Sequence, residues 1–128
     1  MRRLAVFLVS IFLFVTVSFA KSPIADIAQA FNSANGDVVA SYFDSNIDLK
    51  ILDNENIYSR QQARILLFNF ISDKKPTGFV LKHEGGPDNA RFAIGELTAK
   101  DGVYRVYYLL KEKSGTIFIY KLRIEPNE

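Results

Sequence analysis

The pattern of apolar and polar positions is clearest between residues 79 and 125, where it predicts four consecutive strands. These runs are rich in aromatic and β-branched residues and are separated by turns that contain Gly, Asp and Ser, which is typical of an antiparallel meander. We interpret the rest of the domain as the part that packs against this sheet. The predicted strands are Phe79–Glu84, Ala90–Ala99, Val103–Glu112 and Thr116–Glu125.

Two short helices are predicted before the sheet. Ser22 is suited to an N-cap and Pro23 to the first helical position. The Asn35-Gly36 pair predicts a left-handed end for this helix. A second helix is predicted over Val38–Phe43, with Asp37 as its cap. The apolar residues of the first helix recur at helical spacing at Ile24, Ile27, Ala28 and Phe31.

A further strand and a third helix are predicted between these helices and the meander. Residues Asn46–Leu52 alternate between apolar and polar, which predicts a half-buried strand. We interpret Asp53–Asn56 as a polar turn. Ser59 and Gln62 have the spacing of a capping box at a helix start, and Pro76 ends that helix because proline disfavours helical geometry in the residue before it.

The faces of the meander depend on the lengths of its last two turns. Three-residue loops with Gly in the left-handed position are predicted at Lys100–Gly102 and Lys113–Gly115. This register separates apolar from basic side chains best, and a one-residue slip would reverse every side chain. The inner face then carries Phe92, Ile94, Glu96, Thr98, Tyr104, Val106, Tyr108, Leu110, Phe118, Tyr120, Leu122 and Ile124. The outer face carries Arg91, Ala93, Gly95, Leu97, Arg105, Tyr107, Leu109, Lys111, Ile117, Ile119, Lys121 and Arg123.

Residues 1–20 have the pattern of a secretory signal peptide. A short basic start is followed by Leu4–Phe19, which contains no charge, and Ser18 and Ala20 are small at the two positions that a signal peptidase reads. We therefore expect cleavage before Lys21, a single domain over residues 21–128, and a periplasmic or secreted location without a membrane anchor. The alternative is an uncleaved anchor, although the uncharged run is slightly shorter than the about 20 residues of a spanning helix.

Composition narrows the classes of function. The chain has 16 basic and 14 acidic residues, and loss of Arg2 and Arg3 with the signal leaves 14 of each, so nucleic-acid binding is not expected. There is no cysteine, which excludes disulfides, a lipid-attached Cys and thiolate metal ligands. His83 is the single histidine, so one protomer cannot build a multi-histidine metal site. We expect neither a metal nor a cofactor.

The order of several short segments adds a family resemblance. A polar break over Phe31–Asp37 leads to Tyr42-Phe43 and Asn46–Leu49, Tyr58–Ala63 begins the third helix, and Asp101-Gly102 marks a late hairpin. In this order they resemble the nuclear transport factor 2-like superfamily, which has a cystatin-like cone fold and includes polyketide cyclases. Within it, the resemblance is greatest to a small secreted bacterial branch of unassigned function. The resemblance implies an α+β fold, in which a curved antiparallel sheet wraps around a long helix and forms a cone with a pocket. It implies no single activity, because isomerases, cyclases, dehydratases and non-enzymatic domains share this fold.

Polar groups on the predicted inner face define a candidate ligand pocket in the cone. Two of them, Glu96 and His83, could act as acid and base in an isomerase, cyclase or dehydratase, since burial would perturb both pKa values. The resemblance places an acidic base of steroid isomerases on the first strand, where this chain has Ile51 or a close neighbour, and the first helix has no Tyr. We therefore expect binding of a small apolar molecule rather than catalysis. The pocket would be lined by Glu96, His83, Tyr104, Tyr108, Tyr120 and Phe92.

The predicted outer face supports a second hypothesis, a homodimer interface. An apolar patch rimmed by basic residues is typical of a protein interface, although the basic residues taken alone favour a solvated face. The sequence thus predicts a non-catalytic binding or dimerisation domain, with an enzyme as the alternative. The patch comprises Leu97, Tyr107, Leu109, Ile117 and Ile119, and its rim Arg91, Arg105, Lys121 and Arg123.

Overall fold

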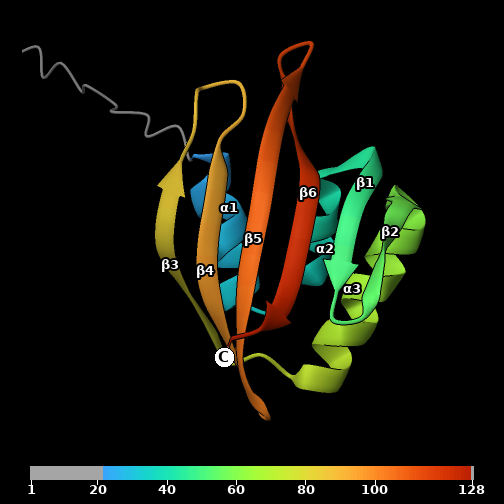
Figure 1. The fold of residues 1–128 in the computed structure, drawn as a ribbon, viewed down its shortest axis with the longest axis vertical. Coiled ribbons are helices and arrows are strands. Elements are labelled where there is room, and N and C mark those ends of the chain that lie inside the picture. The colour runs from blue at the N-terminus through green and yellow to red at the C-terminus, as the bar shows by residue number, and fades with distance from the viewer. Residues whose placement is uncertain (1–21, 128) are drawn as a thin grey trace, which may run out of the picture.

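The computed structural model describes residues 22–127 and shows one curved six-stranded sheet with helices packed on its concave face (Figure 1). This is the expected α+β cone, and the predicted signal segment lies outside the described residues. The elements are α1 Pro23–Asn32, α2 Gly36–Ser41, β1 Phe43–Ile51, β2 Asn54–Ser59, α3 Arg60–Lys74, β3 Gly78–Gly85, β4 Phe92–Ala99, β5 Gly102–Lys113 and β6 Thr116–Pro126. The strands lie in the order β2-β1-β6-β5-β4-β3, and all neighbours are antiparallel except β1 and β6.

The junction between α1 and α2 differs from the prediction by one or two residues. Ala34, not Gly36, takes the positive φ of 53° after α1. Asn35 caps α2, because its side-chain oxygen accepts a hydrogen bond from the Val38 amide at 3.3 Å. The second helix therefore begins at Gly36 and ends at Ser41, two residues earlier than predicted.

The predicted limits of α3 are confirmed. The Ser59 hydroxyl accepts from the Gln62 amide at 3.3 Å, and the Gln62 side chain accepts from the Ser59 amide at 3.3 Å, which completes the capping box. The helix ends at Lys74, and Lys75 takes a left-handed φ of 47° directly before Pro76.

Of the segment predicted as a polar turn, Asp53 lies in a turn, and residues 54–56 form the start of strand β2, which continues to Ser59. It pairs with β1 without interruption from Asn46 opposite Ser59 to Ile51 opposite Asn54. The prediction was wrong because β2 is an edge strand with almost wholly exposed side chains, only Tyr58 being half-buried. A strand of this kind needs no apolar alternation.

Both predicted three-residue loops are wrong, because the two hairpins are one residue tighter. Ala99 pairs with Gly102, and Lys113 pairs with Thr116. A β-bulge then shifts the β5–β6 register, because Leu109 pairs with Lys121 while Leu110 pairs with Ile119, so Tyr120 has no partner. Beyond the bulge, the extra residue restores the predicted faces of β6, although the pairing partners differ, since Leu122 lies opposite Tyr108.

The new register corrects the predicted faces. The inner positions of β5 are confirmed, as are those of β6 beyond the bulge, but β4 and the start of β6 are inverted. The concave face carries Ala93, Gly95, Leu97, Ala99, Tyr104, Val106, Tyr108, Leu110, Ile119, Leu122 and Ile124. The convex face carries Val80, His83, Phe92, Ile94, Glu96, Val103, Arg105, Tyr107, Leu109, Lys111, Phe118, Tyr120, Lys121 and Arg123.

Side chains from α1 and the sheet fill the concave face. Tyr108 is fully buried, and its hydroxyl donates a 2.8 Å hydrogen bond to the Ile24 carbonyl of α1. The Phe31 ring lies 5.3 Å from the Phe79 ring and 6.2 Å from the Tyr108 ring, measured between centroids. No buried side-chain nitrogen or oxygen among residues 22–127 lacks a hydrogen-bond partner, so the core contains no spare polar group for a ligand.

The close approach of Phe79 to Gly95 generates a prediction. A Cβ at Gly95 would lie 2.2 Å from the Phe79 ring and 2.8 Å from the Val80 carbonyl oxygen. We expect Gly95→Ala to lower the free energy of unfolding by about 1–3 kcal/mol, because the ring and the neighbouring strand must move apart. Urea unfolding measures this change.

Gly78→Ala is the matched control in an adjacent strand. Its added Cβ would have its nearest neighbour at 3.7 Å, an ordinary contact. If the two variants lose the same stability, the packing of Phe79 over Gly95 is not as described.

Candidate functional site

The predicted ligand pocket is not assembled, because its six residues lie on opposite faces of the sheet. Tyr104 and Tyr108 are buried on the concave face, with exposed fractions of 6% and 0%. The remaining four, Glu96, His83, Phe92 and Tyr120, lie on the convex face. Inversion of β4 and the bulge in β6 cause this division.

The pair proposed for acid–base chemistry lies in a solvated setting. The Glu96 carboxylate accepts a 3.3 Å hydrogen bond from the Asn127 amide and lies 3.8 Å from the Lys82 ammonium. His83 is exposed and packs its ring 5.7 Å from that of Phe92. The buried environment that would have tuned both groups for proton transfer is therefore missing.

On the first strand, the position compared with the isomerase base is apolar as expected. Ile51 is buried on the concave face. A different acid, Asp44, is the single buried polar or charged residue among those described, with an exposed fraction of 6%. Sequence reasoning missed it, because no pattern in β1 distinguishes it and its partner is 69 residues away.

Asp44 connects the start of β1 to the β5–β6 hairpin. Its carboxylate accepts a hydrogen bond from the Lys113 ammonium, with which it forms an ion pair, and another from the Ser45 amide at 2.8 Å. These donors hold the pKa of Asp44 below its usual value of 3.8, with the Lys113 hydrogen bond as the main cause, against the opposing effect of burial. A carboxylate that is held charged by a lysine has a structural role rather than that of a general base.

Aromatic side chains lie at several places on the convex face. The His83 and Phe92 rings are followed by Tyr107, whose ring stacks on Phe92 at 6.1 Å. In the neighbouring part of the face, the Lys111 ammonium lies 3.7 Å above the Tyr120 ring, a distance suited to a cation–π interaction. We call this set, together with Ile94, Leu109 and Phe118, the aromatic surface.

The predicted dimer patch is only partly on this side of the sheet. Tyr107 and Leu109 lie half-buried on the convex face as expected. Leu97 and Ile119 are fully buried on the concave face, and Ile117 packs against the core. The corrected register replaces these three by Phe92, Ile94 and Phe118.

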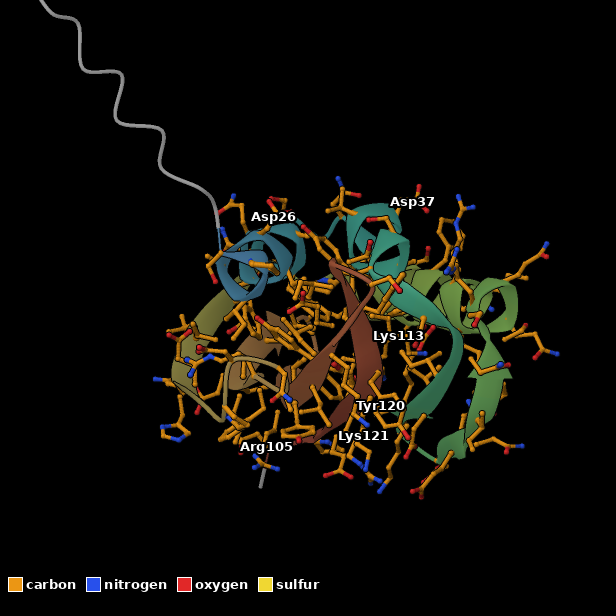
Figure 2. All side chains as sticks on the ribbon, turned by 90° about the horizontal axis from the view of Figure 1, so that it is seen from above. Asp26, Asp37, Arg105, Lys113, Tyr120 and Lys121 are labelled. Atoms are coloured by element: carbon orange, nitrogen blue, oxygen red, sulfur yellow. The ribbon has the colours of Figure 1, made fainter. Side chains whose placement is uncertain are left out.

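The rest of the convex face carries basic and acidic side chains that form ion pairs with one another. Lys50 and Glu125 lie 2.7 Å apart, and their hydrogen bond raises the pKa of Lys50 and lowers that of Glu125. Two residues of the predicted basic rim are likewise paired with acids, and the pairs are Lys121–Asp48 at 3.5 Å and Arg123–Glu55 at 3.5 Å. Figure 2 shows Arg105, Tyr120 and Lys121 together on the side away from the helices.

One cavity lies where the N-terminus of α1, the β3–β4 loop and the β5–β6 hairpin meet. Its volume is about 150 Å³, and its apolar lining includes Ile24, Leu110 and Ile117. Its charged lining includes Glu84 and Arg91, which form an ion pair at 3.7 Å. Pockets for small organic ligands usually have about 300–1,000 Å³, so this cavity is small for that purpose and contains none of the predicted pocket residues.

Two further features, a metal-binding cluster and a membrane-spanning helix, are absent from residues 22–127. This part of the chain contains no group of three or more His, Asp or Glu side chains placed to hold a metal ion. None of its helices is both long and apolar enough to cross a bilayer.

Comparisons with known proteins agree on a family and a fold. Residues 24–125 match the family described as "Domain of unknown function (DUF4783)". A crystal structure of a DUF4783 family protein from Bacteroides fragilis is 27% identical, with a TM-score of 0.76, and the match covers 84% of this chain and 100% of that one. A second, from Bacteroides ovatus, is 25% identical, with a TM-score of 0.77 and coverage of 81% and 94%.

A more distant neighbour identifies the fold alone. It is an NTF2-like protein of unknown function from Cytophaga hutchinsonii, 11% identical with a TM-score of 0.57, and the match covers 81% of this chain and 86% of that one. Among curated proteins, none matches this chain. The NTF2-like fold that the resemblance implied is thereby confirmed, and no activity comes with it.

The Asp44–Lys113 pair generates a pH-dependent prediction. Because the folded-state pKa of Asp44 is lowered, its stabilising contribution is present above pH 3.8 and is lost as the pH falls through the folded-state value. We expect Asp44→Asn to lower the free energy of unfolding at neutral pH by about 1 kcal/mol, a modest value because the Lys113 end is exposed. Urea unfolding at a series of pH values should show the two proteins converging below pH 3.8.

Asp53→Asn, in the exposed β1–β2 turn, is the control for removing one carboxylate. A stability difference for Asp44→Asn that stays constant down to the lowest pH would contradict the assigned charge pair.

Proposed function

The chain belongs to the DUF4783 family, whose description assigns no activity, and we propose that it is a non-catalytic binding domain that pairs with a second copy through its convex face. The aromatic surface is the observation that carries this proposal. It carries half-buried rings and the exposed ring of Tyr120, on a sheet whose other face is buried along β4, β5 and β6.

The composition of the convex face supports a protein interface. Aromatic side chains are enriched at interface centres, and polar or charged groups surround them. Here the rings of Phe92 and Tyr107 lie on β4 and β5, and the ion pairs lie towards β1 and β2. Apolar side chains at the margins remain open to solvent, including Ile57 at 69% and Val80 at 57% exposed.

The same face is suited to pairing with itself. A two-fold contact brings the same patch from each copy together, so each patch must carry groups that complement its own. The convex face offers rings that can stack and charges of both signs, with Lys50 and Lys121 near Glu125 and Asp48. Pairing would remove the aromatic surface from water, which is the main favourable term.

Two other functions receive less support. A small apolar ligand in the cone would need space that Phe31, Phe79 and Tyr108 occupy. An isomerase, cyclase or dehydratase would need Glu96 and His83 in a shielded site, and both are on the convex face. We also propose secretion with cleavage before Lys21, on the basis of the charge and hydrophobic pattern of residues 1–20.

A charge placed in the aromatic surface tests the pairing. Tyr107→Glu removes the ring that stacks on Phe92 and adds a charge that would be desolvated in the dimer. We expect the dimer dissociation constant to rise roughly thirtyfold, about 2 kcal/mol, as for a central aromatic residue of an interface. Sedimentation equilibrium over a concentration series measures it.

Gln29→Glu adds the same charge on α1, on the other side of the molecule, and should leave the dissociation constant unchanged. A wild-type protein that stays monomeric at tens of micromolar would overturn the proposal. Equal effects of Tyr107→Glu and Gln29→Glu would show that the contact lies elsewhere.

A further inference from the structure

The helical side of the molecule carries a second apolar surface that the sheet does not cover. The side chains of Ile65 and Phe68 on α3 are 54% and 62% exposed. They are one helical turn apart, on the side of α3 opposite Ala63, Leu67 and Phe70, which are buried. Within residues 22–127, two large apolar groups are thus left mostly uncovered at one place.

A hollow lies directly beside these two side chains. Its volume is about 530 Å³, and Ala40 and Ser41 of α2 face Arg60 of α3 across it. A smaller hollow of about 280 Å³ is lined by Ile65 and Phe68. Both hollows share Asp37, Gln61 and Arg64, so the protruding side chains and the larger hollow form one continuous surface.

The charged groups of this surface are incompletely paired. The Arg64 guanidinium contacts the same oxygen of Asp37 twice, through Nε at 3.1 Å and through Nη2 at 3.1 Å. The other carboxylate oxygen, Oδ2, has no hydrogen bond from any residue of the described range. Arg60 donates its Nε to the Phe43 carbonyl at 2.9 Å and forms no ion pair with residues 22–127. The Oδ2 atom of Asp37 can therefore accept a further hydrogen bond, and the terminal nitrogens of Arg60 can donate to an anionic partner.

We propose that this helical surface, defined by Asp37, Ala40, Ser41, Arg60, Gln61, Arg64, Ile65 and Phe68, binds the same surface of a second copy of this chain. Phe68 and Ile65 of each copy enter the hollow of the other, and Arg60 of each copy donates to Asp37 Oδ2 of the other. A two-fold contact requires a protrusion and a matching hollow on the same patch, together with a donor and an acceptor. The helical surface has all four.

Other occupants fit the same features less well. A flat lipid surface would contact Phe68 but would leave the hollow beside it empty. An acidic peptide would pair with Arg60 but would have to compete with the carboxylate of Asp37, which the surface already supplies. A second copy uses the protruding side chains, the hollow and both charges at once.

This contact is separate from the pairing of the sheets. In Figure 2, Asp37 lies beside the helices, and Tyr120 and Lys121 lie on the opposite side of the molecule. One copy can therefore make both contacts simultaneously. Two different two-fold contacts on opposite sides produce assemblies larger than a dimer.

The test uses Tyr107→Glu protein, in which the sheet contact is blocked, and measures self-association by sedimentation equilibrium. We expect concentration-dependent dimers that Phe68→Glu weakens by about tenfold or more. Asn69→Glu, the adjacent exposed residue on the same helix, is the matched control and should leave the dissociation constant unchanged. Both variants change exposed positions, and circular dichroism and thermal unfolding confirm that they fold.

Exchange of charges tests the specific pairing. In Tyr107→Glu protein, Asp37→Arg and Arg60→Asp should each weaken the remaining dimer, while an equimolar mixture of the two variants should form heterodimers, because each contact then regains one cation and one anion. Native mass spectrometry separates the species by mass. A mixture that remains monomeric would overturn the proposed pairing of Arg60 with Asp37.

Failure of this proposal is distinguishable from failure of the sheet dimer. If sheets do not pair, Tyr107→Glu has no effect and Phe68→Glu alone produces monomers. If the helical surface does not self-associate, Tyr107→Glu is monomeric at every concentration, which overturns the proposal. Binding of that monomer to phosphatidylglycerol vesicles, lost on Phe68→Glu, would also overturn it and would assign the surface to a membrane.

Discussion

The unpaired residue Tyr120 in β6 determines which side chains of that strand lie on each face of the sheet. Both hairpins next to β5 are tight, and a uniform register would have placed Lys111 on the face that holds Leu122. The bulge adds one residue between Ile119 and Lys121, so the basic side chains and the core side chains stay on opposite faces. The same residue places its ring under Lys111 on the convex face.

Covering of the concave face depends also on the tight β4–β5 hairpin, which sets the faces of β4. Small residues, Ala93 and Gly95, lie where Phe92 and Ile94 were predicted, and this leaves room for the rings of Phe79 and Phe31 and for α1. The hydroxyl of Tyr108 then finds the Ile24 carbonyl as its partner. Because these side chains fill the cone, a binding partner would have to contact the outer surface of the domain, and both of our proposals therefore concern surfaces.

Much of the fold could be predicted from local signals, and the site could not. Some elements were predicted correctly because each depends on a short-range pattern that has a single physical explanation. These are the capping by Ser59 and Gln62, the helix end at Pro76 and the alternation from Ile47 to Ile51. The face of β4 depends on a turn length and on Phe79, which covers Gly95 from another strand, and no local pattern records that contact. The role of Asp44 depends on Lys113, and β2 has no apolar pattern to find.

The central claim is that the convex face, and not the interior of the cone, is a binding surface. Side-chain NMR spectra recorded over a dilution series test it most directly. The account predicts that the ring signals of Phe92, Tyr107 and Tyr120 shift together on dilution, while those of the buried Tyr104 and Tyr108 stay constant. Ring signals on the convex face that do not change with concentration, or a shift confined to Tyr104 and Tyr108 on addition of an apolar ligand, would contradict it.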